Sequence, residues 1–494
     1  MYWLGIDVGT GGTRALLVDA KGTIAASHTA PHEEMTMQRP LWAEQRPENW
    51  WDAAKLAIRG VLSAASVTGE QVKGIGLSGQ MHGLTLLDAA DDVIRPALIW
   101  CDQRSQAQVD WINKHVGRDK VLEYTANPVV TGFTLPKLLW VRDNEPTHFE
   151  RIRKVLLPKD YVRFQLTGEY ASDVSDASGT SLFDVVHRRW SYDMADACGI
   201  GRSVLPAVYE SVQATGSVAE TVAAETGLQA GTPVVAGAGD QAASAVGNGI
   251  TESGIVSCTL GTSGVVFAHM DNPHYDPAGR VHTFCHAVKN KWHVMGVTQG
   301  AGFSLQWFRN QLCPGTSYDD LMVEAASAEP GSQGLFWLPY LMGERTPHLD
   351  ATARAAWVGL TAKHTRADVV RSIIEGVCFS QRDGLDIIED MEVPVDSVRL
   401  SGGGAQSPFW RQTMADVLGK RVTTLASQEG SAYGAALLAV TGTGEYGSIE
   451  ECCRVAIAEV AEVLPRQTEF AEYTRMHKTY QSLYPALKPI YGQL

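Results

Sequence analysis

The stretch VVAGAGDQAASAVGNG, residues 234–249, determines the fold prediction for this chain. It begins with a short apolar strand, 234–236, passes through two glycines and reaches a single carboxylate, Asp240. The small residues that follow can begin a helix that packs close to another backbone, because glycine and alanine allow such an approach. We therefore expect a strand-to-helix turn that presents Asp240 where the glycines leave room for a substrate.

Two glycine–threonine loops flank this carboxylate along the chain. The first belongs to GIDVGT, residues 5–10, and the second to CTLGTSG, residues 258–264. Backbone amides in glycine-rich turns form concave sites that bind phosphate groups. The two loops therefore predict a phosphate clamp with a general base between its two parts.

The two loops also indicate an internal repeat. GIDVGTGGTRALLVD, residues 5–19, and VSCTLGTSGVVFAHM, residues 256–270, share a plan of strand, Gly-Thr-x-Gly turn and strand. A chain of 494 residues exceeds what one core usually organises. We therefore predict an α/β protein with two similar domains, 1–248 and 249–494. A cleft between domains is a common place for a small ligand.

The remaining pattern predicts elements on both sides of these loops. Apolar residues recur at helical spacing over 48–65, which indicates an amphipathic helix. The predicted strands are 2–6, 14–18, 23–27, 72–77, 84–87, 255–260, 265–267 and 397–400. Further helices are predicted at 136–142, at 161–167 and from a start near Ser407.

Composition excludes several classes of partner. The net charge of −14 argues against nucleic acid and against an anionic membrane surface. No apolar run is long enough to span a bilayer, and the first residues predict a strand rather than a signal sequence. The 8 cysteines show no metal-ligand spacing, so we expect reduced thiols in a cytoplasmic protein. The sequence leaves open whether the chain forms a homodimer.

Asp7 and Asp240 are the candidate catalytic carboxylates. Asp7 ends a predicted strand beside glycines, where a hard oxygen ligand would suit a magnesium ion that carries ATP phosphates. The alternative is an aspartate that caps the hairpin turn. Asp240 could be the general base and could also be a helix N-cap, a position that aspartate favours; the two roles are compatible.

Three other segments could line a site. The turn 402–405 follows a strand, and its glycines would let a base or ribose lie against backbone, although such turns often need glycine for packing alone. The turn 80–83 carries His82, which could bind hydroxyls or hydrogen-bond only to backbone. Asp102 and Arg104 could bind a substrate, or they could form a structural ion pair.

Two longer motifs carry a resemblance to a known family. They are GFTLPKLLWVRDN at 132–144 and the stretch 355–375, which begins AAWVGL and ends SIIE. Over nearly its whole length the chain resembles the FGGY carbohydrate kinases of the actin/hexokinase/heat-shock ATPase superfamily. That resemblance implies two ribonuclease-H-like domains with an interdomain cleft.

Within this family the chain most resembles the branch that phosphorylates D-xylulose. The segments that carry this finer resemblance are 80–83, 157–161 and 339–347. Glycerol kinases carry an Arg-Glu pair where this chain has Met81 and His82, which disfavours glycerol. Gluconokinases tend to carry serine where Gly83 stands.

The resemblance implies ATP-dependent phosphorylation of a small-molecule sugar with Mg²⁺. Asp240 would accept the proton of the sugar hydroxyl, Asp7 would position the metal, and Met81, His82 and Gln241 would contact the sugar. The nucleotide would lie against Gly9, Thr10, Gly261, Thr262, Gly302, Gln306, Gly404 and Ala405. The alternatives are a kinase for another ketopentose or a polyol, and a non-catalytic module of the same fold that ATP switches.

Overall fold

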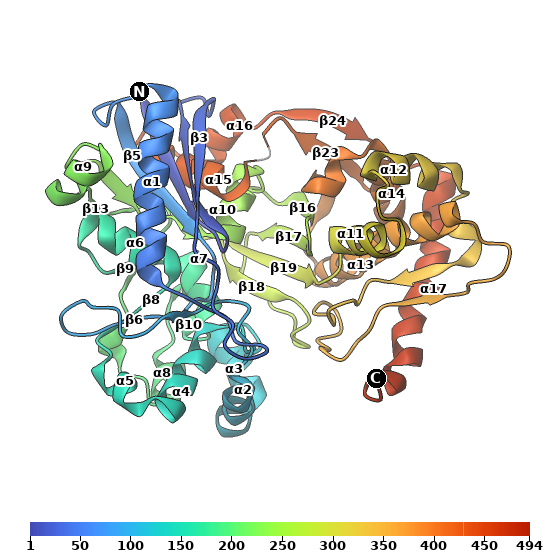
Figure 1. Cartoon of the computed structure of the whole chain (residues 1–494), viewed down its shortest axis with the longest axis horizontal. Helices are drawn as coiled ribbons and strands as arrows, with labels where there is room; N and C mark the ends of the chain where they lie inside the picture. Colours follow the sequence, from blue (N-terminus) through green and yellow to red (C-terminus); the bar gives the residue numbers. More distant parts are fainter. Residues whose placement is uncertain (428) are drawn as a thin grey trace.

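Two lobes, each built around a seven-stranded sheet, make up the computed structural model, which describes residues 1–427 and 429–494 (Figure 1). The strands of the first sheet are β1 (Tyr2–Val8), β2 (Gly12–Val18), β3 (Ile24–Pro31), β5 (Val72–Gly79), β13 (Ala214–Ser217), β14 (Pro233–Val235) and β15 (Ala238–Gly239). Those of the second are β16 (Gly254–Leu260), β17 (Gly264–Met270), β18 (His282–Cys285), β19 (Trp292–Thr298), β22 (Val395–Ser401), β23 (Arg421–Leu425) and β24 (Glu459–Val463).

The two sheets repeat one plan. In the first sheet β1, β2 and β3 are antiparallel neighbours, and β5 lies parallel to β1 on its other side. In the second sheet β16, β17 and β19 take the antiparallel positions and β22 lies parallel to β16. The prediction of two similar α/β domains is confirmed, and each glycine–threonine loop joins the first two strands of its sheet.

The predicted elements are present, with small shifts at their ends. Helix α1 (Pro47–Ala65) matches the predicted amphipathic helix, and its apolar face, which includes Trp50, Ile58 and Val61, is buried. Proline at its first position fits, because a proline there loses no helical hydrogen bond. The predicted strand 234–236 is β14, after which the chain forms one more short strand, β15, before Asp240.

The other elements complete the two lobes. The remaining helices are α2 (Gln106–Ile112), α3 (Arg118–Thr125), α4 (Thr134–Asn144), α5 (Pro146–Arg151), α6 (Pro158–Thr167), α7 (Val174–Ala177), α8 (Tyr192–Ala197), α9 (Glu220–Thr226), α10 (Asp240–Gly247), α11 (Gly302–Leu312), α12 (Tyr318–Ser327), α13 (Arg366–Asp390), α14 (Pro408–Leu418), α15 (Gly430–Gly442), α16 (Ile449–Ala456) and α17 (Gln467–Tyr491). Short strand pairs are β4 (Glu44–Gln45) with β7 (Ala97–Leu98), β6 (Thr85–Leu87) with β8 (Lys154–Leu156), β9 (Ala171–Asp173) with β12 (Ala207–Tyr209), β10 (Phe183–Asp184) with β11 (Arg189–Trp190), and β20 (Phe336–Leu338) with β21 (Ala356–Val358).

Helices α10 and α15 cross at the junction of the two lobes (Figure 1). A Cβ atom on Gly434 would lie 1.8 Å from the carbonyl oxygen of Ala243, and one on Gly247 would lie 2.5 Å from that of Gly430. The backbones therefore touch, as the small residues after Asp240 predict. Helix α15 also packs on the first sheet, where a Cβ on Gly5 would meet the Ala432 carbonyl oxygen.

Among the residues that the structure describes, no helix combines the length and the apolar character needed to cross a bilayer.

Candidate active site

The two candidate carboxylates lie at one edge of the first sheet. Strands β1, β5 and β15 run parallel, and in their register Asp7 is opposite Ser78 while Ser78 is opposite Ala238. Asp240 follows Ala238 by two residues, at the point where the strand becomes helix α10. The carboxyl ends of parallel strands are the usual ligand edge of such sheets, so the fold gathers both carboxylates there.

The turn before Asp240 needs its glycines. Gly237 has a φ of +76°, and a Cβ on it would lie 2.0 Å from the Leu77 carbonyl oxygen. A Cβ on Gly239 would lie 2.9 Å from the Met81 side chain. Gly239 is the N-cap residue of α10, and within 1–427 and 429–494 no side chain caps that helix. Asp240 is therefore the first residue of α10 rather than its N-cap, so the helix-cap interpretation is wrong.

Burial raises the pKa of both carboxylates, and the charge of Asp7 adds to the rise at Asp240. Burial, together with the nearby charge of Asp7, raises the pKa of Asp240 to about 7, while hydrogen bonds from Gln241 act against that rise. Burial also raises the pKa of Asp7, against the opposing effects of the Ser78 hydroxyl and the Arg14 charge. A base whose pKa lies near neutral pH is well matched to proton transfer at that pH.

The first glycine–threonine loop is held in place by several side chains. Ser78 Oγ donates to Asp7 Oδ1 at 2.6 Å, so the contact of Asp7 runs across the strands rather than to the hairpin turn. Trp100 Nε1 donates to Thr10 Oγ1 at 2.9 Å, and Gln45 Nε2 donates to the Thr10 carbonyl oxygen at 2.7 Å. Gln80 Nε2 donates to the Gly9 carbonyl oxygen at 3.3 Å. This network leaves Gly9 and Thr10 in a fixed loop beside Asp7.

The predicted nucleotide residues of the second lobe gather around the second loop. The backbone amide of Gly302, the first residue of α11, donates to the Gly261 carbonyl oxygen at 2.7 Å, and the next amide donates to that of Thr262 at 3.2 Å. A Cβ on Gly404 would lie 2.8 Å from the Leu260 side chain. Gln306 lies about one turn farther along α11, and Ala405 is buried beside Gly404.

The turn 402–405 supports both of its interpretations. Gly402 has a φ of +84°, and a Cβ on it would lie 2.7 Å from the backbone of Leu260. This glycine is therefore needed for packing. A Cβ on Gly403 would meet nothing within 4 Å, so the backbone there stays open.

His82 is partly buried in a site to which both lobes contribute. It has a φ of +69°, stacks on Phe133 with ring centroids 4.5 Å apart, and its Nδ1 pairs with the Gly179 carbonyl oxygen at 2.7 Å. Burial is the main cause that lowers the pKa of His82 to about 3, and the charges of Lys137 and Arg345 add to it. A neutral ring that donates from Nδ1 has Nε2 left as an acceptor for a hydroxyl.

Met81 is buried in an apolar cluster that joins the lobes. Phe133 of the first lobe and Phe267, Phe284 and Met295 of the second belong to the same cluster. The Met81 side chain also packs against Gly239, directly before Asp240. The sugar contacts predicted for Met81, His82 and Gln241 stay predictions, although the fold brings these residues to one region.

Other polar side chains near the site were not predicted. Arg345 Nη2 pairs with His282 Nε2 at 3.0 Å, and the Arg345 charge acts on His82 from the second lobe. The segment 339–347 points to this arginine only through the family resemblance. Among the described residues, Asp102 and Arg104 form a buried ion pair at 2.8 Å, which agrees with the structural alternative for them.

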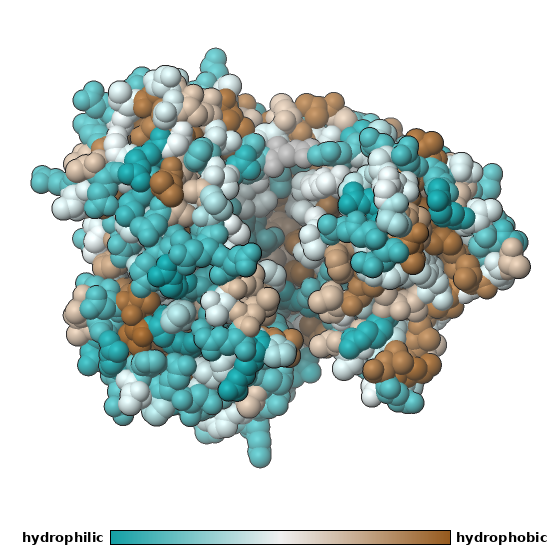
Figure 2. Space-filling model, in the orientation of Figure 1, coloured by the Kyte–Doolittle hydropathy of each residue, from teal (hydrophilic) through white to brown (hydrophobic). Residues whose placement is uncertain are grey.

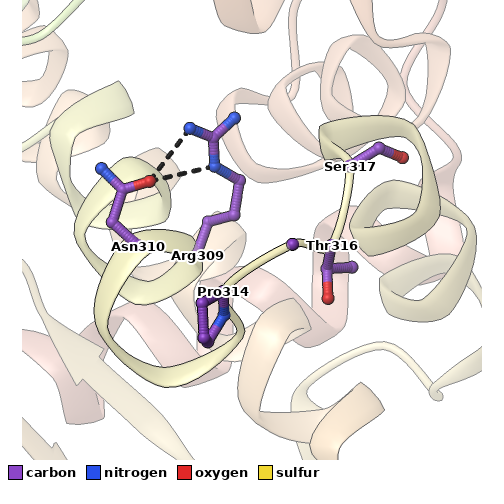
Figure 3. Close-up of a pocket in the computed structure, with 6 residues that line it drawn as sticks. Arg309, Asn310, Pro314, Thr316 and Ser317 are labelled. Atoms are coloured by element: carbon purple, nitrogen blue, oxygen red, sulfur yellow. Dashed lines mark hydrogen bonds between the residues drawn. The ribbon is translucent and has the colours of Figure 1, made fainter.

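The surface is hollowed in more than one place. Figure 2 shows the surface deeply hollowed between the two lobes. A separate open hollow of about 430 Å³ lies at the far end of α11 and is lined by Arg309, Asn310, Pro314, Gly315, Thr316 and Ser317. Figure 3 shows the labelled side chains of this lining around the turn that follows α11. Arg309 lies seven residues after Gly302, so this hollow begins roughly 10 Å along the helix from the second glycine–threonine loop.

The carboxylates fit a magnesium ion that is held mainly by the phosphates of a bound nucleotide. Among the residues that the structure describes, no group of three or more His, Cys, Asp or Glu side chains could enclose a metal. Mg²⁺ usually binds through one or two carboxylates, with phosphates and water completing its shell. Asp7, at the edge beside the first loop, matches that donor set, and it stays the predicted metal ligand.

Comparison with known proteins agrees with this arrangement. The family model for the N-terminal domain of the FGGY carbohydrate kinases matches residues 2–247, and that for the C-terminal domain matches 256–443. The chain belongs to the FGGY family of carbohydrate kinases. It is 40% identical to a xylulose kinase of Escherichia coli (strain K12) over 491 residues, which cover 99% of each protein.

Further relatives support the same assignment. A xylulose kinase of Bacillus subtilis (strain 168) is 38% identical over 489 residues, which cover 99% of this chain and 98% of that protein. A crystal structure from Brucella ovis, described as a xyloylose kinase, superimposes with a TM-score of 0.92 at 37% identity and covers 99% of this chain and all of that one. The predicted actin/hexokinase-like sugar kinase fold is confirmed.

Proposed function

We propose that this kinase transfers the γ-phosphoryl group of ATP to the 5-hydroxyl of D-xylulose. The observation that carries the proposal is Asp240, a partly buried carboxylate with a pKa raised to about 7, at the start of α10 and, along the chain, between the two glycine–threonine loops. The full-length similarity to xylulose kinases supports the choice of sugar.

Asp240 would act as the general base. Its carboxylate would accept the proton of the sugar hydroxyl as that oxygen attacks phosphorus, so a free alkoxide is not required. Phosphoryl transfer depends mainly on alignment and on charge stabilisation rather than on covalent chemistry. The Gly9–Thr10 and Gly261–Thr262 loops would align the phosphates through their backbone amides, and the amide at the start of α11 supports the second loop.

The family uses ATP with Mg²⁺. Asp7 would hold the ion, which when bound neutralises charge on the phosphate oxygens. Ser78 donates to Asp7 Oδ1 and so orients the carboxylate for this role. Gln306, Gly404 and Ala405 would border the rest of the nucleotide.

Sugar selection would depend on the His82 side of the site. The unprotonated Nε2 of His82 could accept a hydrogen bond from a sugar hydroxyl, and Met81 would shape the apolar wall beside it. Gln241, next to the base, would reach the same sugar. Another ketopentose or a polyol is the alternative substrate.

A substrate panel tests this proposal. ADP release should be measured with D-xylulose, other ketopentoses, polyols and gluconate at fixed ATP and Mg²⁺. We expect the highest kcat/KM with D-xylulose and little ADP release without sugar. A higher kcat/KM for another compound would transfer the assignment to that compound, and ATP hydrolysis that no sugar stimulates would favour the non-catalytic module.

Two further proposals concern the whole chain. We propose a division into domains 1–248 and 249–494, supported by the end of α10 at Gly247. We propose a cytoplasmic location, since all eight cysteines are free thiols. The homodimer stays a possibility, which sedimentation of the purified protein would test.

A further inference from the structure

Five charged side chains lie fully buried behind the Asp240 turn. They are Lys159, Asp160, Arg163, Asp173 and Asp176, each at most 1% exposed. Burial of ions costs free energy that mutual pairing only partly offsets, so such a cluster is a poor source of stability by itself. The contacts between the cluster and its surroundings therefore indicate what role the cluster has.

One line of contacts runs from the cluster to the turn. Lys159 Nζ lies 2.7 Å from Asp173 Oδ1. Asp173 Oδ2 accepts hydrogen bonds from the Ser175 amide at 2.7 Å and from the Ser175 hydroxyl at 2.5 Å. Ser175 Oγ in turn accepts a hydrogen bond from the Gly239 amide at 3.1 Å. Gly239 directly precedes Asp240.

A second line holds the other end of the same turn. Arg163 Nη1 donates to the Ala236 carbonyl oxygen at 2.7 Å, and its Nη2 pairs with Asp160 Oδ1 at 2.7 Å. Lys159 also lies 2.7 Å from Asp160 Oδ1. The cluster therefore fixes both ends of the four residues that lead into Asp240.

The Ser175 hydroxyl has a defined orientation. It carries one proton, which it gives to the Asp173 carboxylate, so only a lone pair can face the Gly239 amide. Without that acceptor the buried amide would lack a partner among the described residues, and an unsatisfied buried donor is costly enough to shift the backbone. A shift of the turn would carry the Asp240 carboxylate with it.

We propose that Ser175, held by Asp173 and Lys159, is a positioning residue that sets the place of the Asp240 carboxylate for proton transfer. The proposal rests on the proposed role of Asp240 as base. Ser175 touches neither substrate nor the reacting atoms; it acts through the Gly239 amide. Displacement of a reacting group by about 1 Å can cost on the order of 10²-fold in rate.

The test compares two buried serines. Ser175→Ala should lower kcat roughly ten- to hundred-fold while the KM values for D-xylulose and ATP stay within about threefold. Ser178 provides the matched control, because its buried hydroxyl accepts a hydrogen bond from the Cys285 amide at 3.0 Å and does not contact the turn. Ser178→Ala should lower the melting temperature by about as much as Ser175→Ala does, and it should leave kcat within about twofold of wild type.

Two more variants separate geometry from folding. Ser175→Thr retains the hydroxyl and should restore most of kcat, whereas Ser175→Cys fills the space with a weak acceptor and should show the same loss as alanine. Circular dichroism and thermal melts would verify that each variant is folded.

The outcomes distinguish this inference from the proposed function. If Ser175→Cys is folded with wild-type kcat, or if kcat falls equally in Ser178→Ala, Ser175 is only structural and the inference is overturned. If Asp240→Asn itself retains turnover, the assigned base is wrong. Loss of turnover in Asp240→Asn together with the predicted loss in Ser175→Ala would support both.

Discussion

At the scale of single residues, the ionised form of Asp240 that catalysis needs is the form that the fold stabilises least. Its pKa is raised from the usual value of 3.8 to about 7, so the fold disfavours the anion that a base must present. The sign of the effect on stability follows. A carboxyl with a raised folded pKa stabilises the fold fully below the unfolded pKa and loses that contribution as pH rises through about 7.

Asp240→Asn should therefore separate the two properties. The amide cannot take a proton, so turnover should fall by roughly 10²–10⁴-fold, with sugar affinity within a few-fold. The same variant should melt at a higher temperature than wild type at pH 8, and the difference should vanish near pH 4, because the amide removes a buried charge. Calorimetry at both pH values would measure it. Near-normal turnover would remove Asp240 as the base.

The protonation of Asp240 should also determine the pH dependence of turnover. Below about pH 7 the Asp240 carboxylate becomes protonated, so kcat/KM for D-xylulose should fall about tenfold per pH unit on the acid side. His82, with a pKa lowered to about 3, stays neutral and should add no step between pH 5 and 8. A flat profile from pH 5 to 8 would contradict this assignment of the base.

His82 should affect the sugar more than the nucleotide. Loss of a buried hydrogen-bond partner costs about 1–3 kcal/mol, so His82→Asn should raise the KM for D-xylulose roughly tenfold and leave that for ATP nearly unchanged. Asparagine is chosen because it tolerates the positive φ at this position better than alanine. Equal increases in both constants would mean that His82 supports the fold or the hinge instead.

At the scale of elements, short sequence patterns predicted the turns and hairpins whose conformation depends on neighbouring residues. Alternating apolar strands around Gly-Thr turns predicted both hairpins, and the glycines before Asp240 predicted the strand-to-helix turn. The partners of those turns could not be predicted. Ser175 lies 64 residues before Gly239, and only tertiary packing brings its hydroxyl to that amide. The same holds for Arg345 beside His82, since no local pattern links segments so far apart.

The crossing of α10 and α15 gives an element-scale prediction. The sequence predicted that small residues after Asp240 would pack against some backbone, and the partner is Gly434, where a Cβ would lie 1.8 Å from the Ala243 carbonyl oxygen. Gly434→Ala should lower the free energy of unfolding by about 1–3 kcal/mol, since the two helices must separate. Urea denaturation would measure this. Gly201→Ala is the control, because a Cβ there meets nothing within 4 Å; equal stability of the two variants would contradict a tight crossing.

At the scale of the whole molecule, the duplicated sheets imply movement between the lobes. Each lobe presents one glycine–threonine loop on its own hairpin, and the surface is hollowed between the lobes (Figure 2). One nucleotide can engage both loops only if they approach it together, and closure around ligands is a common motion of two-lobed enzymes. Helix α15, from the C-terminal half of the chain, packs on the first sheet and crosses α10 backbone to backbone, so this crossing is one connection between the two halves of the chain.

Small-angle scattering can test this closure on the full chain. Asp240→Asn with D-xylulose and a non-hydrolysable ATP analogue should show a smaller radius of gyration than the same protein without ligands, because both loops then contact one nucleotide. Nucleotide alone should produce less compaction, since the sugar is needed to complete the site between the lobes. Calorimetric titration of the same samples would establish that both sites are filled. If full occupancy leaves the radius of gyration unchanged, the lobes are already closed around the site, and water must be excluded by the ligands themselves rather than by a domain movement.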